Sequence, residues 1–507
     1  MTADPQDRLA AAEQAILARR PEQSIEPSLD RIAALTELLG DPQRAYPVIH
    51  LTGTNGKTST ARMIDTLLRA RGLRTGLFTS PHLSSMRERI CVDGELLSAE
   101  RFADAYDEVL PYAELVDASQ PARLSFFEML TAMAFAVFAD APVDVAVIEV
   151  GVGGTWDCTN VADGAVAVVT PISIDHTRYL GSTIPAIAGD KAGIIKPGSV
   201  AVLAQQPLEA AEVLLRRVAE VGATVAREGL EFGVVSRELA VGGQLLGLRG
   251  LLGGYEEVFL PLFGAHQAGN AACALAAVEA FAGAATWDAA AGGALAGGAL
   301  AGGAPAGGEA VGRGGQPGAL GDELVRQAFS RMSSPGRLEV VRRSPVVLVD
   351  AAHNPAGMAA AVAALSESFT FSELVAVIAV SEDKDVPGIL DELEPLAAQL
   401  IVTRNSSARS MEPGKLADLA VSVFGADRVI EAARLDDAIE IAARLADESD
   451  AGQARGAGLP GSAAVLVTGS VVTAGDARRL LTGGPAEHPA PGQAGEGPLA
   501  SGPPGLP

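Results

Sequence analysis

The chain has 507 residues, 48% of them hydrophobic, and a formal net charge of −24. Its length predicts at least two domains, and its charge argues against a nucleic-acid partner, whose phosphates need a basic surface. Three widely spaced cysteines predict a reducing compartment, and the lack of a signal-peptide pattern or of about 18 consecutive apolar residues predicts a cytoplasmic protein with no membrane span.

The first predicted strand runs into a glycine-rich loop. Residues 51–59 read Leu-Thr-Gly-Thr-Asn-Gly-Lys-Thr-Ser, and a helical pattern follows them. Strand, glycine loop, Lys-Thr/Ser and helix form the layout of a phosphate-binding loop. Lys57 can then reach the outer phosphates, and Thr58 or Ser59 can place a hydroxyl on phosphate or Mg²⁺. Leu51 stands where the common motif has its first glycine, so this is a shorter variant; a plain glycine turn with a surface lysine is the alternative.

Strand-like and helix-like segments then alternate, which predicts a parallel sheet with helices on both faces and ligands at the carboxyl ends of the strands. Glu149 ends one apolar strand and precedes a glycine loop. A carboxylate in that place suits Mg²⁺, although a salt-bridged glutamate is the alternative. The predicted strands are 46–51, 73–78, 144–150 and 165–170, and the predicted helices are 60–71, 99–115 and 124–139.

The chain divides into three predicted parts, the first of which contains an insertion. Residues 1–334 form the first domain, and a Gly/Ala-rich stretch within it, 284–320, lacks large apolar side chains and is predicted to be a disordered insertion. Residues 335–482 form a smaller Rossmann-like α/β unit, and the Pro/Gly-rich tail 483–507 is predicted to be disordered. The strands predicted in the smaller unit are 346–349, 375–380, 400–403 and 464–468, and its helices 354–366, 415–424, 435–445 and 475–481.

Polar residues follow several of these strands. A lone histidine is more often structural than functional, but the strand-end positions of His176 and His353 favour a function for them. Lys191 and Lys196, taken without context, are ordinary surface lysines. In the second unit, Arg337, the segment Asp350-Ala-Ala-His-Asn-Pro and the segment Asp383-Lys-Asp could close over a nucleotide bound to the first domain.

In their order along the chain, these motifs resemble the folylpolyglutamate synthases, of the bacterial bifunctional dihydrofolate synthase type, within the Mur ligase superfamily. The resemblance covers residues 20–480 apart from the Gly/Ala stretch. Ser-Pro-His-Leu together with Asp-x-Ala-His-Asn-Pro favours the folate branch over the cell-wall ligases. The matching segments are 53–59, 79–83, 125–128, 149–154, 157–160, 175–176, 180–181, 191–198, 264–270, 335–337, 350–355, 384–385 and 468–470.

The resemblance implies an α/β fold, with a Mur-ligase-like P-loop ATPase domain and a smaller Rossmann-like C-terminal domain. It implies an ATP-dependent amide ligase that adds L-glutamate to dihydropteroate and to reduced folates. The γ-phosphoryl group would pass to a substrate carboxylate, and the amine of glutamate would displace phosphate from the acyl phosphate. Two Mg²⁺ sites and a monomer are also implied, and the need for a monovalent cation is left open.

The resemblance assigns roles to individual residues. Lys191 would be carbamylated, because an unmodified ammonium cannot ligate a metal. Catalytic roles would fall to Lys57, His176 and Lys191, and metal binding to Ser59, Ser80, Glu149, His176 and Lys191. ATP would be bound by Gly53, Thr54, Asn55, Gly56, Lys57, Thr58, Ser59, Asn270, Arg337, Asp350 and His353. Substrate would be bound by Ser125, Phe127, Asp157, Lys384 and Ser470, with Lys384, His353 and Ser470 near the incoming glutamate.

The chain departs from the pattern of the folate branch at Thr58, Asp190, Ala351 and the pair Thr155-Trp156, where glycine, glutamate, glycine and Arg-Leu are usual. Three other functions remain as alternatives. A ligase for a cell-wall precursor or another amino-acid polymer should carry an additional N-terminal nucleotide-sugar domain, and only a short segment precedes the phosphate loop. A non-catalytic nucleotide-binding module should lack Glu149, His176 or Lys191, and a simple phosphotransferase does not need the polar second domain.

Overall fold

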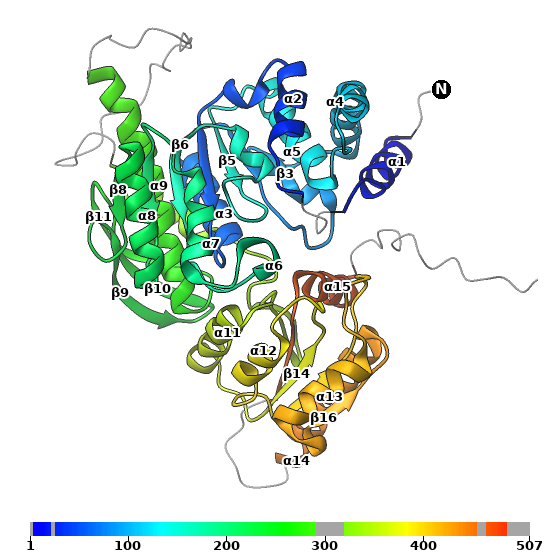
Figure 1. Ribbon diagram of the computed structural model, residues 1–507. Helices are drawn as coiled ribbons and strands as arrows, with labels where there is room; N and C mark the ends of the chain where they lie inside the picture. Colours follow the sequence, from blue (N-terminus) through cyan, green and yellow to red (C-terminus); the bar gives the residue numbers. More distant parts are fainter. Residues whose placement is uncertain (1–3, 22–25, 291–318, 454–462, 484–507) are drawn as a thin grey trace, which may run out of the picture.

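The computed structural model describes residues 4–21, 26–290, 319–453 and 463–483. They form two α/β units, the second below the first in Figure 1. Most of the predicted insertion and nearly all of the predicted tail lie outside the described residues. Helix α9 (Ala265–Ala290), however, continues past the predicted start of the insertion, and Leu320 at its predicted end is buried. No helix in the described ranges is long and apolar enough to cross a membrane.

The first unit is built on an eight-stranded sheet with the order β4-β3-β2-β5-β1-β6-β7-β8. The six strands from β2 to β8 in that order run parallel, and β3 and β4 add an antiparallel edge. All five residues of the central strand β1 are buried, as expected for a parallel strand covered on both faces. The bounds are β1 Val48–Thr52, β2 Thr75–Phe78, β3 Ile90–Val92, β4 Glu95–Leu96, β5 Val145–Glu149, β6 Gly164–Val169, β7 Val200–Leu203 and β8 Thr224–Arg227.

Alternate residues of these strands pack into different cores, because successive side chains of a strand point to opposite faces. Val145 and Val147 face the core beneath α3, α9 and α10, whereas Ala146 and Ile148 face the core beneath α1, α2, α4 and α5. A third core lies under α7 and α8. The helices are α1 Pro5–Leu17, α2 Asp30–Leu38, α3 Lys57–Ala70, α4 Ala99–Ser119, α5 Phe126–Asp140, α6 Thr177–Leu180, α7 Ile184–Lys191, α8 Leu208–Val221 and α10 Asp322–Ser330.

A three-stranded antiparallel sheet in the first unit has no counterpart in the sequence prediction. It consists of β9 (Gly233–Ala240), β10 (Gly243–Arg249) and β11 (Gly254–Leu260) and packs against α9. Strand β9 is mostly exposed, so it lacks the apolar run by which the parallel strands were predicted. The sheet lies at the left of Figure 1, where β9 and β10 contact α9.

The second unit has a six-stranded sheet with the order β12-β13-β17-β14-β15-β16, parallel except for the edge strand β12. One face is covered by α11, α12 and α13 and the other by α14 and α15. The predicted fold class is confirmed, although β12, β16 and α12 were not predicted. The bounds are β12 Glu339–Arg343, β13 Val346–Val349, β14 Leu374–Ile378, β15 Gln399–Val402, β16 Val429–Glu431, β17 Ala464–Thr468, α11 Pro355–Ser368, α12 Val386–Leu393, α13 Pro413–Phe424, α14 Leu435–Gln453 and α15 Val471–Thr482.

The two units meet where the carboxyl ends of strands from both sheets face each other, near α6, α11 and α15 in Figure 1. Leu83, from the loop after β2, packs against the core under α14 and α15 of the second unit. The backbone there is so close that a Cβ atom on Gly475 would lie 2.0 Å from the Leu83 carbonyl oxygen. The predicted domain boundary at 334/335 falls between α10 and β12 and stays a prediction.

Candidate active site

The phosphate loop connects β1 to α3 and depends on two glycines. Gly53 (φ +147°) and Gly56 (φ +89°) adopt backbone conformations that favour glycine. A Cβ atom on Gly53 would lie 1.9 Å from Thr170 Oγ1, and one on Gly56 would lie 2.5 Å from Asn270 Oδ1. Asn270, on α9, therefore lies directly against the loop, as its predicted role in ATP binding requires.

Two lysines converge on the carbonyl oxygen of Gly53. Lys57 Nζ donates to it at 3.1 Å and to the Thr54 carbonyl oxygen at 3.2 Å, and Lys191 Nζ donates to it at 2.7 Å. Burial, with the nearby charge of Lys57, lowers the pKa of Lys191 to about 7. Burial also lowers the pKa of Lys57, against the opposing charge of Glu149. Lys191 is therefore no surface lysine but a buried amine at the phosphate loop.

Glu149 ends β5 beside the first turn of α3. Its carboxylate accepts a hydrogen bond from Thr58 Oγ1 (2.9 Å) and one from the Ser80 backbone N–H (3.3 Å). Burial raises the pKa of Glu149, and the charge of Lys57 opposes that rise. The predicted metal ligand Ser59 instead contacts Ser334, with 3.0 Å between the two hydroxyl oxygens. The structure thus places Thr58, rather than Ser59, beside the predicted carboxylate ligand.

The candidate ligands near the loop suit Mg²⁺ better than a metal whose ligands all come from protein side chains. In the described part of the chain, no three His, Cys, Asp or Glu side chains gather to hold a metal ion. Magnesium, however, is commonly held by one or two carboxylates together with water and substrate phosphates. Glu149, Thr58 and Ser80 fit that pattern. Burial and the charge of Lys384 lower the pKa of His176 to about 3, so its imidazole is neutral and able to act as a ligand.

Asp175, in the loop after β6, brings residues of both units together. Its carboxylate accepts hydrogen bonds from Lys384 Nζ (2.6 Å) and Asn354 Nδ2 (3.0 Å), and His353 Nε2 lies 3.5 Å away. Asn354 also exchanges two hydrogen bonds with Asn55 of the phosphate loop, at 3.1 and 3.2 Å. The predicted strand-end residues of the second unit therefore do face the first.

Arg337 lies in the segment that connects the two units, and Asp350 follows β13 of the second unit. Both carboxylate oxygens of Asp350 accept hydrogen bonds from nearby backbone N–H groups, those of Leu338 (2.9 Å) and Ala352 (2.8 Å). Asp350 therefore holds together the two backbone segments that carry Arg337 and His353. Arg337 donates to the Gly336 carbonyl oxygen (3.2 Å), and its charge acts on both Lys57 and Glu149.

Three of the predicted substrate residues line one cavity of about 60 Å³. Ser125 caps the N-terminus of α5, and Phe127 packs against Gly151, where a Cβ atom would lie 2.7 Å from its ring. Asp157 accepts four hydrogen bonds, from the N–H groups of Gly151 and Val152 and from the N–H and hydroxyl of Thr159, so it also holds the loop after β5. The lining residues not predicted include Arg20, Arg31 and Glu128.

Ser470, the other residue predicted near the incoming glutamate, has a local structural role. Its hydroxyl oxygen caps α15 by accepting from the Thr473 N–H (2.9 Å) and accepts from Asn405 Nδ2 (3.0 Å). No described hydrogen bond joins it to Lys384. Asp175 and Asn354 are junction residues to which the sequence motifs assigned no role, although both stand in segments that the resemblance matched.

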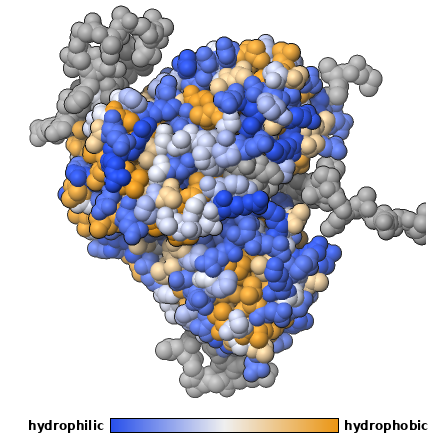
Figure 2. Space-filling view, viewed as in Figure 1, coloured by the Kyte–Doolittle hydropathy of each residue, from blue (hydrophilic) through white to orange (hydrophobic). Residues whose placement is uncertain are grey.

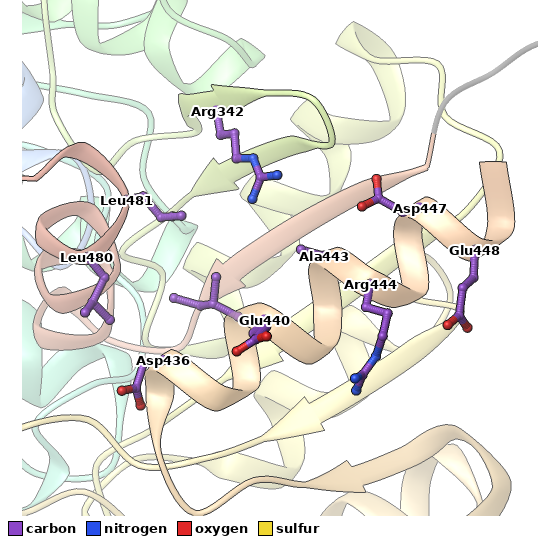
Figure 3. Close-up of a pocket in the computed structure, with 10 residues that line it drawn as sticks. Arg342, Asp436, Glu440, Ala443, Arg444, Asp447, Glu448, Leu480 and Leu481 are labelled. Atoms are coloured by element: carbon purple, nitrogen blue, oxygen red, sulfur yellow. The ribbon is translucent and has the colours of Figure 1, made fainter. Parts of the chain in front are cut away.

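A larger cavity, of about 600 Å³, lies elsewhere. Figure 3 shows it between α14, α15 and β12 of the second unit, with both charged and apolar side chains along it. None of the predicted site residues lines it. On the face seen in Figure 2, the surface is largely hydrophilic, as the net charge leads one to expect. The residues lining the cavity are Arg342, Asp436, Ile439, Glu440, Ala443, Arg444, Asp447, Glu448, Leu480 and Leu481.

Comparison with known proteins gives consistent results over both units. Residues 51–278 match the Mur ligase middle domain, and residues 336–470 match the Mur ligase glutamate ligase domain. A dihydrofolate synthase/folylpolyglutamate synthase of Mycobacterium tuberculosis is 48% identical over 91% of this chain and 92% of its own. A structure of the M. tuberculosis folylpolyglutamate synthase complexed with ADP superposes with a TM-score of 0.84 at 46% identity, covering 96% of this chain and 100% of that one. A structure described as an FPGS-AMPPCP-folate complex superposes with a TM-score of 0.73 at 28% identity, covering 93% and 99%.

Proposed function

Because this chain belongs to the Mur ligase family, in its dihydrofolate synthase/folylpolyglutamate synthase branch, we propose that it adds L-glutamate to dihydropteroate and to the γ-carboxylate of reduced folates. It is an ATP-dependent ligase. The observation that carries the proposal is the convergence of Lys57, Lys191 and Glu149 on one glycine loop, with Lys384 and His353 of the second unit facing that loop across Asp175.

ATP would bind with its phosphates on the loop 53–59. The backbone N–H groups at the N-terminus of α3 and the ammonium of Lys57 would receive the phosphate oxygens. That requires Lys57 to leave the carbonyl oxygens of Gly53 and Thr54, which it contacts in this structure. Asn270 and Arg337 would add contacts from α9 and from the connection between the units.

Two Mg²⁺ ions would neutralise phosphate charge. Glu149 and Ser80, with the hydroxyl of Thr58 or Ser59, would hold one, and His176 with carbamylated Lys191 would hold the other. Carbamylation joins the neutral amine of Lys191 to the carbon of CO₂ with loss of one proton, which leaves an anionic oxygen ligand. A buried lysine with a pKa of about 7 has the neutral amine that this addition needs.

The reaction then proceeds in two displacements. A carboxylate oxygen of the pterin substrate attacks the γ-phosphorus atom, and ADP leaves with the electrons of the broken P–O bond. The amine of glutamate next attacks the acyl carbon, phosphate leaves, and the amine gives up a proton. The protein would contribute mainly positioning and charge stabilisation, which we assign to Lys57, Arg337 and Lys384.

The cavity lined by Ser125, Phe127 and Asp157 would receive part of the pterin substrate, and Lys384, His353 and Ser470 would lie near the incoming glutamate. With about 60 Å³ of space, the cavity must widen to admit a pterin ring. We further propose that the enzyme acts as a monomer in the cytoplasm, with domains 1–334 and 335–482.

The test is ADP release by the purified protein with Mg-ATP and L-glutamate, comparing dihydropteroate with tetrahydrofolate. Turnover with both supports the bifunctional enzyme, and turnover with tetrahydrofolate alone restricts it to polyglutamylation. If neither dihydropteroate nor tetrahydrofolate supports glutamate-dependent turnover, the folate assignment is contradicted and a ligase for another carboxylate is favoured.

A further inference from the structure

One carboxylate of the first unit binds a cluster of side chains from the second. Asp175 is 8% exposed, and three residues of the second unit surround it. Lys384 Nζ donates to its Oδ1 at 2.6 Å, Asn354 Nδ2 donates to its Oδ2 at 3.0 Å, and His353 Nε2 lies 3.5 Å from Oδ2. Its own loop adds one donor, the His176 backbone N–H, at 2.7 Å.

The ammonium of Lys384 donates to the carboxylate of Asp175, and both side chains are mostly buried. The contact with Lys384 is therefore a charge-assisted hydrogen bond between two mostly buried groups, stronger than a neutral one. Removing one partner would leave the other charge buried and uncompensated.

Asn354 connects this contact to the phosphate loop. The amide that donates to Asp175 also donates to Asn55 Oδ1, and Asn354 Oδ1 accepts from Asn55 Nδ2. The same Oδ1 caps α11 by accepting from the Gly357 N–H at 2.8 Å. Asp175, the phosphate loop and the start of α11 thus form one continuous hydrogen-bonded group.

Lys384 depends on Asp175 for its position. Its four-carbon side chain is flexible, it carries a compact charge, and only 10% of the side chain is exposed. In the part of the chain that the structure describes, Asp175 is the acceptor for its ammonium. Lys384 stands just before Asp385, the residue that caps the N-terminus of α12.

We propose that Asp175 is a positioning residue of the ligase reaction, which fixes Lys384 across the domain boundary so that its ammonium meets a substrate carboxylate at the edge of the phosphate loop. The inference rests on the proposed function. It adds Asp175 as the residue that holds the ammonium of Lys384 in position. Contacts such as that of Leu83 with the core of the second unit do not involve Asp175, so the domains stay associated without it.

The experiment is a double-mutant cycle in the full chain with Asp175→Asn, Lys384→Met and the double variant, after a check of each melting temperature. Turnover is measured as ADP release, with kcat and the KM values for glutamate and ATP determined separately. Each single variant should lose about 30-fold or more in kcat/KM for glutamate, with a much smaller change in KM for ATP. The double variant should lose no more than the worse single variant, because one residue acts through the other.

A matched control is Asp163→Asn, which removes an Asp–Lys pair on the surface, where Lys196 Nζ lies 3.0 Å from an Asp163 carboxylate that is 75% exposed. It should stay within about twofold of the unaltered enzyme. The inference would be overturned, and the proposed function left standing, if the losses in kcat/KM of the two single variants multiplied in the double variant. Unchanged kinetics of Asp175→Asn would have the same meaning. Should Asp175→Asn not fold, unchanged kcat/KM in Lys384→Met would overturn it as well. No turnover in the unaltered protein would overturn the proposed function and this inference together.

Discussion

Lys191 Nζ donates a 2.7 Å hydrogen bond to the carbonyl oxygen of Gly53, which joins the last residue of α7 to the first glycine of the phosphate loop. The same oxygen receives the ammonium of Lys57. Two amines on one carbonyl oxygen repel each other when both are charged. That repulsion adds to burial in lowering the pKa of Lys191 to about 7.

The first prediction concerns pH and CO₂. Because the pKa of Lys191 is lowered to about 7, its amine is mostly neutral above pH 7 and mostly protonated below it. Only the neutral amine adds CO₂, so carbamylation should fall as pH is lowered through 7. In CO₂-depleted buffer, the enzyme should need several-fold more added bicarbonate for half-maximal activity at pH 6 than at pH 8. Carbon-13 NMR with labelled bicarbonate should show a carbamate signal that Lys191→Ala lacks.

Second, Lys191→Ala should abolish turnover, because no other side chain described at Gly53 would provide the anionic oxygen. Short carboxylates such as acetate should restore part of the activity by occupying the vacated space. Lys415→Ala, which removes a lysine 60% exposed at the surface, is the control and should change little. Near-normal activity of Lys191→Ala would contradict the carbamate proposal.

Third, Gly56→Ala should impair ATP binding more than a backbone penalty alone explains. Alanine at φ +89° costs about 1–2 kcal/mol, and its Cβ would lie 2.5 Å from Asn270 Oδ1, so the Asn270 side chain or the loop must move. Gly72→Ala is the matched control, since it has φ +85° and no atom within 4 Å of the new Cβ. KM for ATP should rise about tenfold or more only in Gly56→Ala; equal KM values would exclude this crowding as the cause.

Fourth, Glu149→Gln should raise the Mg²⁺ concentration needed for half-maximal turnover by at least about tenfold, because it removes a negative oxygen ligand without changing side-chain size. Titration of activity with Mg²⁺ at saturating ATP provides the measurement. Thr58→Val removes the hydroxyl that donates to Glu149 and should shift the titration less. An unaltered Mg²⁺ requirement in Glu149→Gln would remove this residue from the metal site.

Fifth, Tyr255→Phe should destabilise the first unit without affecting the site. The Tyr255 hydroxyl donates to Glu279 at 2.6 Å and accepts from the Leu320 N–H at 3.1 Å, so its loss leaves two buried polar groups unsatisfied. The expected cost is about 1–3 kcal/mol in the free energy of unfolding, measured by urea denaturation. Tyr112→Phe, at a position 39% exposed, should cost far less.

The features that depend on short segments of the chain could be predicted from the sequence. Loop 53–59 was predictable because glycine, lysine and hydroxyl residues occur at fixed spacing next to a strand and a helix. The parallel strands were predictable from apolar runs. Thr58 and Ser59 could not be told apart, because neighbouring residues in a first helical turn point in directions about 100° apart and the phase depends on the strand before them.

Contacts between residues that are far apart in the sequence were not predicted. The bond between Asp175 and Lys384 joins residues 209 positions apart, and no local pattern marks it. The antiparallel sheet β9–β11 was missed because its edge strand β9 is mostly exposed and mixes polar with apolar residues, without a continuous apolar run. Asp157 and Ser470 were predicted to bind substrate, and the hydrogen bonds found for them also hold a loop and cap a helix.

Leu83 stands three residues after Ser80, whose backbone N–H donates to Glu149, and its own side chain lies against the core of the second unit. One short segment of chain is therefore attached to the proposed metal site at one end and to the partner domain at the other. The placement of the second unit and the geometry around Glu149 therefore share one short segment of backbone.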